Sequence, residues 1–196
     1  MPTIEERLKA SFDRYFEAPL EAWGVFASKC EPIGVRKDQV LKRPGAREEF
    51  GYFILQGSGG VFLWRGKTDV CLDLVYEDAF FADYMSLITN QASPLETRAL
   101  EASEMLRISR ASIAELKASP MGAVIFLISA EASFVEKQQQ QIDLLVSTAE
   151  QRYHELVVRQ PALVQRTAQK HIASFLGITT QSLSRIRRKR ATRSSA

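Results

Sequence analysis

Residues 169–188 read QKHIASFLGITTQSLSRIRR, and this segment decides how the chain is interpreted. Ala173 and Gly177 lie four residues apart. A helix-turn-helix needs a small side chain where its helices cross and, in its turn, a residue that accepts positive φ. Thr179 or Thr180 can cap the second helix. The apolar positions that can pack the two helices together are Ile172, Leu176, Ile178, Leu183 and Ile186. The segment therefore predicts a helix-turn-helix.

The outer face of the second helix carries hydrogen-bonding and cationic side chains, as a reader of the DNA major groove requires. Arg185 can bind guanine or a phosphate, and Gln181 can pair with adenine. The alternative is a helical hairpin whose polar face is only solvated. The candidate DNA-binding residues are Gln169, Lys170, Thr179, Thr180, Gln181, Ser182, Ser184, Arg185, Arg187 and Arg188.

Charge is distributed unevenly along the 196 residues. The formal net charge is +3, yet no Asp or Glu follows Glu155, and the segment after it carries nine Lys and Arg residues. A basic end on a net acidic body is typical of a segment that meets a polyanion such as double-stranded DNA. A disordered, solubilising tail is the alternative that composition leaves open.

From about Trp23 to Ser109 the sequence predicts short strands separated by turns, as in an antiparallel sandwich or roll. Pro44-Gly45, Gly57-Ser-Gly-Gly60 and Gly66-Lys67 mark three of those turns. The expected strands are residues 39–43, 50–55, 61–65, 70–76, 97–99 and 105–108.

Helical patterns flank this region. Apolar residues recur at helical spacing over residues 3–16, and a short helix is expected at 110–118. Residues 121–145 predict a long helix with an apolar seam, which Glu131 and Gln138 interrupt. Such a seam can pair with the same helix of a second subunit, or the helix can lie on its own sheet domain. The seam residues expected at the dimer contact are Val124, Ile128, Val135, Ile142 and Leu145.

Beyond the long helix, Thr148 and Gln151 have the spacing of a capping box. The helix that they begin is expected to end near Arg159, before Pro161, and a short helix at about 161–166 leads into the terminal motif. The predicted fold class is α+β. It comprises an N-terminal antiparallel β-roll of jelly-roll type (residues 1–118), a dimerisation helix (119–146) and an all-α helix-turn-helix domain with a basic tail (147–196).

Other features exclude several function classes. Cys30 and Cys71 are too few for a disulfide framework or a cysteine-rich metal site. His154 and His171 lack metal-ligand spacing, and no nucleophile elbow or P-loop is present. No metal, no cofactor and no enzymatic activity are therefore expected. A solvated face is the expected role of the acidic residues Asp69, Asp73, Glu77, Asp78 and Asp83.

The order of a β-roll, a long helix and a C-terminal helix-turn-helix resembles the Crp/Fnr family, which includes the cyclic-AMP receptor protein. The resemblance spans residues 20–190 and is strongest over residues 169–187, with a further match at Phe53-Ile-Leu-Gln-Gly57. It implies a homodimer joined along residues 121–145, with each subunit reading half of a pseudo-palindromic site.

Two departures from the family matter. In its cyclic-nucleotide binders, a Gly-Glu pair and an Arg-Ser/Thr pair hold the ribose and the cyclic phosphate. Here Asp83 aligns with the carboxylate and Ser93 with the arginine, so tight cyclic-AMP binding is not expected. The candidate ligand-pocket residues are Asp83, Tyr84, Ser93 and Arg98. The chain also has only six residues after Arg190, too few for the hairpin wing usual in the family.

The sequence thus predicts a cytoplasmic, DNA-binding transcription regulator of bacterial type. Its expected partners are double-stranded DNA, a second copy of the chain, RNA polymerase and a small-molecule effector of unknown identity, and no membrane. One alternative is a ligand-sensing or protein-interaction module that does not bind DNA. A second is an enzyme on a cupin-type roll, which would need histidine ligands where none occurs.

Overall fold

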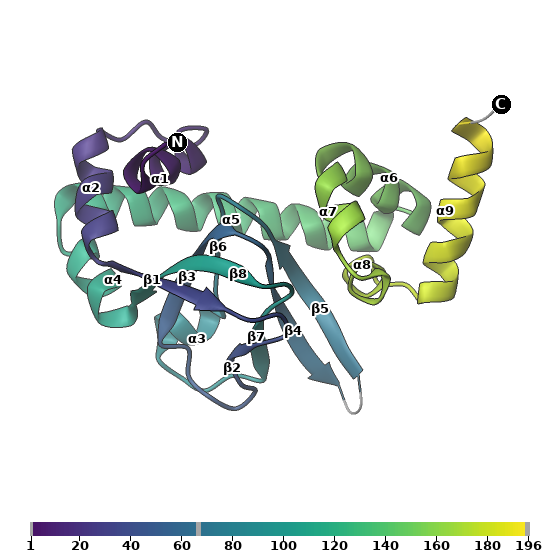
Figure 1. Ribbon diagram of the computed structural model, residues 1–196, viewed down its shortest axis with the longest axis horizontal. Helices are drawn as coiled ribbons and strands as arrows, with labels where there is room; N and C mark the ends of the chain where they lie inside the picture. Colours follow the sequence, from purple (N-terminus) through teal and green to yellow (C-terminus); the bar gives the residue numbers. More distant parts are fainter. Residues whose placement is uncertain (1, 66–67, 195–196) are drawn as a thin grey trace.

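The computed structural model describes residues 2–65 and 68–194, and it confirms the α+β class. A β-roll is followed by one long helix and then by further helices. In Figure 1 the long helix α5 runs along the long axis and joins the roll to the C-terminal helices. The strands are β1 (Cys30–Val35), β2 (Val40–Lys42), β3 (Phe50–Gln56), β4 (Gly59–Arg65), β5 (Thr68–Val75), β6 (Phe80–Phe81), β7 (Leu95–Ala99) and β8 (Ser103–Ser109).

Two antiparallel sheets make the roll, in the orders β1-β8-β3-β6 and β2-β7-β4-β5. Met105 of β8 lies opposite both Ile33 of β1 and Ile54 of β3, and it is fully buried. The turn after β3 needs Gly57, whose φ is +107°, because a Cβ there would lie 2.1 Å from Ser103 Oγ. The buried core of the roll contains Val35, Tyr52, Ile54, Val61, Val75, Phe81, Ala99 and Met105.

The N-terminal region differs from the expectation in one element. The first helix, α1 (Ile4–Phe12), is present, but α2 (Leu20–Ser28) is a second helix where strands were expected from Trp23 onward. Trp23 and Phe26 lie three residues apart, and both are buried against the roll and α1. This spacing is helical, although Gly24 and β-branched Val25 lower the helical propensity locally.

A further helix, α3 (Tyr84–Thr89), also lies where only strands and turns were expected. The other helices match their expected places: α4 (Arg110–Lys117), α5 (Pro120–Val146), α6 (Ala149–Arg159), α7 (Pro161–Arg166), α8 (Gln169–Phe175) and α9 (Thr180–Ser194). The capping box between Thr148 and Gln151 is formed, and Pro161 begins α7. The final helix α9 is longer than expected, because it continues through the basic segment that was predicted to be a tail.

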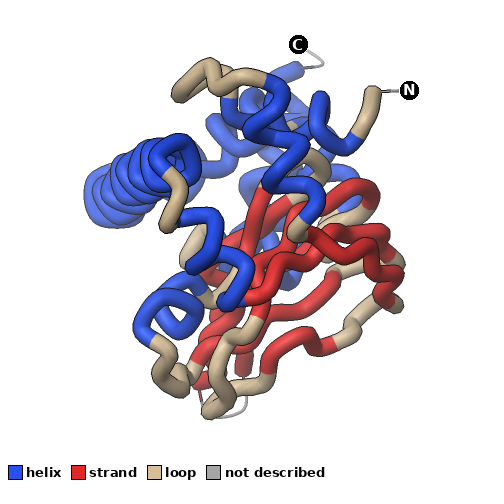
Figure 2. The backbone as a smooth tube through the Cα atoms, turned by 90° about the vertical axis from the view of Figure 1, so that its left-hand side faces the viewer, coloured by secondary structure: helices blue, strands red, loops and turns tan. Residues whose placement is uncertain are grey.

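Figure 2, which looks nearly along α5, shows this helix beside the strands with one flank turned away from them. Within residues 2–65 and 68–194, no single helix is long and apolar enough to cross a membrane. By length and composition, α4 and α5 pass that test only as a pair, bent by 113°.

Candidate functional site

Helices α8 and α9 form a closely packed pair at the C-terminal end of the molecule. Ala173 of α8 is 1% exposed, Leu183 of α9 is fully buried, and both belong to one hydrophobic cluster. Gly177 in the turn has a φ of +69°, which is why glycine suits this position. Thr179 caps α9, since its Oγ1 accepts a hydrogen bond from the backbone N–H of Ser182. The packing predicted from residues 169–188 is therefore present.

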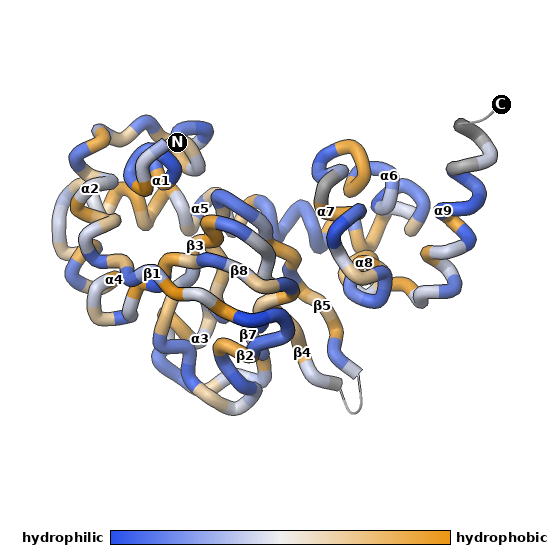
Figure 3. The backbone as a smooth tube through the Cα atoms, in the orientation of Figure 1, coloured by the Kyte–Doolittle hydropathy of each residue, from blue (hydrophilic) through white to orange (hydrophobic). Residues whose placement is uncertain are grey.

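The outer face of α9 is open to solvent. Apart from Ser182, which is half-buried beside Thr179, every candidate DNA-binding residue is exposed. Figure 3 shows hydrophilic stretches along α9 at this end of the molecule. The exposed residues on the two helices and the turn between them are Gln169, Lys170, Thr179, Thr180, Gln181, Ser184, Arg185, Arg187 and Arg188.

The basic residues near the end of the chain belong to the second half of helix α9. Lys189 Nζ lies 2.7 Å from Glu150 Oε2, which ties α9 to α6. Arg187 and Arg188 are exposed one turn beyond Ser184 and Arg185. The basic segment therefore extends the outer face of α9 rather than forming a separate tail.

Helix α8 also packs against strands β4 and β5 of the roll. The Ser174 hydroxyl accepts a hydrogen bond from the backbone N–H of Cys71 on β5 at 2.8 Å. The ring of buried His171 meets Phe62 edge-on at 5.2 Å, and burial lowers the pKa of His171. Arg98 covers the Phe62 ring at 4.4 Å. We call this contact the roll–α8 interface.

Arg166 of α7 gives the roll–α8 interface a charged edge. Its guanidinium lies 2.8 Å from Glu77 and 2.6 Å from Glu101. The hydrogen bonds from Arg166 hold the pKa of Glu77 well below its usual value, at about 2. Tyr76 and Thr167 share a further hydrogen bond close by. The roll and the C-terminal helices are therefore joined by specific polar contacts.

Inside the roll, Lys42 of β2 forms a buried ion pair with Asp83. Their Nζ and Oδ2 atoms are 2.6 Å apart, and their side chains are 1% and 0% exposed. Lys42 Nζ also donates to Ser93 Oγ and to the carbonyl of Leu95, both at 2.7 Å. Burial alone would raise the pKa of Asp83, but the hydrogen bonds from Lys42 and Ser93 outweigh it and the pKa lies below its usual value.

The four residues expected to line a ligand pocket are not brought together. Asp83 and Ser93 meet through Lys42 and a direct hydrogen bond between them. Tyr84 is 49% exposed at the start of α3, and Arg98 instead pairs with Asp69 at 2.5 Å. Asp83 and Ser93 are thus paired with Lys42 and with each other rather than with Tyr84 or Arg98.

Glu48 is a second buried acid beside this ion pair. It is 1% exposed and accepts hydrogen bonds from the backbone N–H of Asp83 at 3.3 Å and from the Thr97 hydroxyl at 3.1 Å. Burial raises the pKa of Glu48 to about 7, and the neighbouring Asp83 charge adds to the rise.

Glu48→Gln is expected to flatten the pH dependence of stability. The pKa of Glu48 rises from an ordinary 4.5 in the unfolded chain to about 7 in the folded protein. The protonated Glu48 carboxyl therefore contributes stability that is fully present below pH 4.5 and is lost as the pH rises through 7. Glutamine does not titrate, so the melting temperatures of the variant at pH 5 and pH 8 should lie closer together than those of the parent. Thermal unfolding monitored by circular dichroism measures this difference.

Neighbouring Glu49 is exposed and supplies the control. Glu49→Gln should leave the parent's difference between pH 5 and pH 8 unchanged. A destabilisation by the amide at position 48 that does not depend on pH lowers both melting temperatures equally. The test therefore uses the difference between the melting temperatures at pH 5 and pH 8. An undiminished difference in Glu48→Gln would show that another group carries the pH dependence.

The seam of α5 is largely exposed. Val135 is 65% exposed and Leu145 79%, while Val124 and Ile142 are also exposed and Ile128 is half-buried. Only Ile125 on this helix is fully buried among the residues that the structure describes. The single chain therefore leaves the expected dimer contact uncovered.

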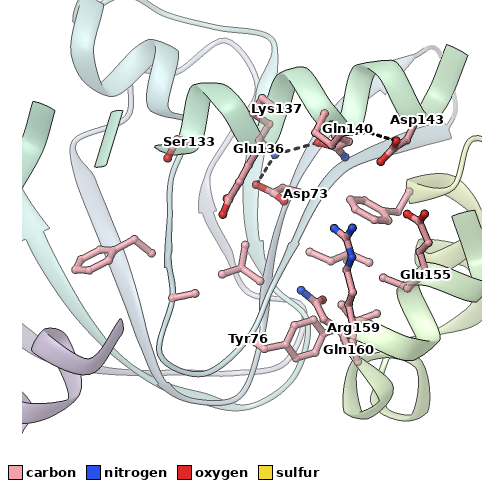
Figure 4. A pocket seen from close by; sticks show the side chains of 18 of the residues that line it. Asp73, Tyr76, Ser133, Glu136, Lys137, Gln140, Asp143, Glu155, Arg159 and Gln160 are labelled. Carbon is pink, nitrogen blue, oxygen red and sulfur yellow. Dashed lines mark hydrogen bonds and ion pairs between the residues drawn. The ribbon is translucent and has the colours of Figure 1, made fainter. Parts of the chain in front are cut away.

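A cleft of about 1140 Å³ lies between the roll, α5 and the helices α6–α8 (Figure 4). Asp73–Phe80 line it from the roll, residues 133–144 from α5, and residues 152–176 from the C-terminal helices. Lys137 bridges two of these walls, with its Nζ 2.8 Å from Asp73 Oδ2. We call this space the interdomain cleft.

Lys42 and Glu48 were not identified from the sequence, and the expectation of a solvated face is wrong for Asp83, which is fully buried. The five acidic residues, which lie on β5 and on either side of β6, pair with cations from β2, β7, α1, α5 and α7. The pairs are Asp83–Lys42, Asp69–Arg98, Asp78–Arg7, Asp73–Lys137 and Glu77–Arg166. Among the described residues, no group of His, Cys, Asp or Glu is placed to hold a metal ion.

Residues 33–119 match the family described as cyclic nucleotide-binding domain. No curated protein matches the chain by sequence. Among solved structures, the chain is similar to FixK2 from Bradyrhizobium japonicum, with a TM-score of 0.70 at 15% identity over 84% of this chain and 86% of that one.

Two further structures have the same arrangement. The c-di-GMP responsive global regulator CLP from Xanthomonas campestris gives a TM-score of 0.64 at 14% identity, covering 90% of this chain and 93% of that one. The catabolite activator protein from Thermus thermophilus gives 0.55 at 19% identity, covering 94% and 87%. The Crp/Fnr resemblance inferred from the sequence is therefore confirmed at the level of the fold.

Proposed function

We propose that this chain, which has the fold of the Crp/Fnr regulators, is a sequence-specific DNA-binding transcription regulator that acts as a homodimer. The observation that carries the proposal is the α8–α9 pair, whose packed side is buried and whose cationic outer face is exposed. A second copy of the chain would cover the exposed seam of α5. Each subunit would then read half of a pseudo-palindromic site.

The proposed DNA contacts divide along α9. Thr180, Gln181, Ser184 and Arg185 lie in the first two turns, where a recognition helix meets base edges. Arg187 and Arg188 follow, and we assign to them contacts with phosphates of the DNA backbone. Gln169 and Lys170, at the start of α8, would also meet the backbone.

In vitro selection from a random DNA pool should enrich a symmetric motif, and Arg185→Ala should then weaken binding to it. We expect a cost of about 1–3 kcal/mol, together with relaxed preference at one base pair in each half-site, because alanine cannot make the bidentate hydrogen bonds of arginine to guanine. Fluorescence anisotropy with the selected duplex and its single-base variants measures both effects.

Two further variants test whether this result is specific to Arg185. Arg188→Ala should weaken binding to all sequences evenly and reduce the log–log salt slope by about 1, since one fewer phosphate is neutralised. Lys37→Ala removes an exposed cation of the roll and should change neither quantity. Parent-like affinity and base preference in Arg185→Ala would remove the proposed role of this residue.

We further propose that the cyclic-nucleotide phosphate site of the roll is degenerate. Lys42, Asp83 and Ser93 satisfy one another where the family's binders hold ribose and phosphate, and all three side chains are buried. Repeating the selection with cyclic AMP should leave the affinity unchanged. A cytoplasmic regulator of this kind would work with RNA polymerase, carry no enzymatic activity and respond to an effector bound elsewhere.

A second candidate function is a partner-binding module that does not bind DNA. The observation that favours it is the roll–α8 interface, because α8 is already engaged in a protein contact. The two candidates differ in one assay: retained dimerisation with no enriched DNA motif would favour the module.

A further inference from the structure

We propose that the interdomain cleft binds an anionic small molecule with an aromatic or apolar body, and that Arg159 is its anchor. This inference rests on the proposed function only where it concerns an effect of the ligand on DNA binding. Ligand binding itself concerns a partly open space that the roll, α5 and the C-terminal helices line. A cleft of about 1140 Å³ exceeds the roughly 300–1,000 Å³ of most small-molecule sites, so it has room for a ligand of nucleotide size.

The cleft keeps its shape through ion pairs at its edges. Lys137 and Asp73 join α5 to β5 at 2.8 Å, and Gln140 of α5 donates to the Leu72 carbonyl at 3.3 Å. At the other edge, Arg166 joins α7 to Glu77 at 2.8 Å. The walls are thus connected before any ligand enters, and preorganisation of this kind reduces the entropic cost of binding.

Arg159 is the cation in the cleft that these pairs leave free. Among the described lining residues, Arg14, Lys137 and Arg166 have carboxylate partners, and Arg152 donates to the carbonyls of Ser147 and Leu176. The Arg159 side chain is exposed and has no hydrogen bond or ion pair within the part of the chain that the structure describes. Figure 4 shows this side chain directed into the space between the roll and α5.

The carboxylates of the cleft are mostly satisfied already. Asp73, Glu77 and Glu136 pair with the cations above, Asp78 pairs with Arg7, and Asp143 accepts from the Gln139 amide at 2.8 Å. Glu155, one turn before Arg159 on α6, has no partner among residues 2–65 and 68–194 and partly offsets its charge. Removing the positive charge of Arg159 should therefore weaken anion binding, and removing the negative charge of Glu155 should strengthen it.

Aromatic side chains supply the second half of the recognition. Tyr76, Phe80 and Phe175 line the cleft from the roll and from α8. A cleft that such rings and a free guanidinium both line suits a ligand that combines a negative charge with a flat apolar body. Since its walls come from both the roll and the DNA-binding helices, an occupied cleft would fix their relative placement and couple binding to DNA affinity.

Fluorescence titration of the full chain with 8-anilinonaphthalene-1-sulfonate, without DNA, tests the site. We expect one probe per subunit and at least roughly tenfold weaker binding in Arg159→Gln, because the charge-assisted hydrogen bond to the sulfonate is removed. Glu155→Gln should bind about two- to fivefold tighter, because the offsetting charge is gone. Lys37→Gln, on the roll surface, should behave like the parent. Parent-like binding in Arg159→Gln, or weaker binding in Glu155→Gln, would overturn the proposal.

Competition distinguishes the sources of the anion. Displacement of the probe by cyclic di-GMP, but not by orthophosphate at equal charge concentration, supports an aromatic anion. Equal displacement by orthophosphate overturns the aromatic requirement. Saturating the cleft should also change the affinity for the selected duplex, and an unchanged affinity overturns the coupling. Because the probe titrations contain no DNA, a failure of DNA binding leaves the test of the cleft intact.

Discussion

Lys42→Met is expected to lower the free energy of unfolding by about 3–5 kcal/mol, since it leaves the buried Asp83 carboxylate without its cation. Only the Ser93 hydroxyl and the N–H of Ser86 would remain as donors to Asp83 among the described residues. Folding in the variant would therefore be coupled to protonation of Asp83, and stability should recover partly at low pH. Urea unfolding of both proteins at two pH values measures this effect.

A double variant and a surface pair make the expectation specific. Lys42→Met with Asp83→Asn removes both charges while keeping a side chain that can cap α3, and it should recover at least half of the loss. Lys29→Met breaks the exposed pair with Glu115 and should cost less than about 1 kcal/mol. A cost below that of Lys29→Met would mean that Asp83 does not need Lys42.

The helix-turn-helix pattern was predictable because its constraints are local. Gly177 must adopt positive φ, and Ala173 must allow close helix packing, so both are readable within a few residues of sequence. The Thr148 capping box and the start of α7 at Pro161 are local in the same way. These elements were predicted at the positions where they occur.

The ion pairs inside the roll, and those between the roll and the helices, were not predictable in this way. Lys42 and Asp83 are 41 positions apart, and nothing near either residue indicates the other. The pairs of Asp73 with Lys137 and of Glu77 with Arg166 span 64 and 89 positions. Such contacts depend on the tertiary arrangement of β5 against α5 and α7, which periodicity does not encode. Sequence therefore located the helix proposed to face DNA but not the connections between it and the roll.

The contacts between the roll and the C-terminal helices determine where α8 and α9 lie relative to the roll. The roll contacts the C-terminal helices through Cys71 and Ser174, through Phe62 and His171, and through Arg166. Of these residues, Arg166 also lines the interdomain cleft. A ligand bound in the proposed site would therefore act on the placement of α8 and α9 through the contacts of Arg166.

Val135→Glu is expected to dissociate the proposed dimer and to weaken binding to the proposed symmetric DNA motif by a factor on the order of 10²–10⁴. Val135 lies mid-seam and is 65% exposed in the single chain, so its replacement leaves the monomer's own core untouched. In a parallel, in-register pair of α5 helices, each new carboxylate would face its counterpart close to Glu131 and Gln138. Sedimentation velocity measures the dissociation, and fluorescence anisotropy measures the weaker DNA binding.

The heptad spacing explains why one charge should suffice. Met121, Ile128, Val135 and Ile142 recur every seven residues, and β-branched side chains at such positions favour two-stranded pairs, but the intervening layers at Glu131 and Gln138 are already polar. Glu131→Leu should therefore tighten the dimer, whereas Ser133→Glu, exposed and roughly 200° around the helix from Val135, should leave it intact. A Val135→Glu protein that remains dimeric would place the contact between subunits away from this seam, and the symmetric motif would then need another explanation.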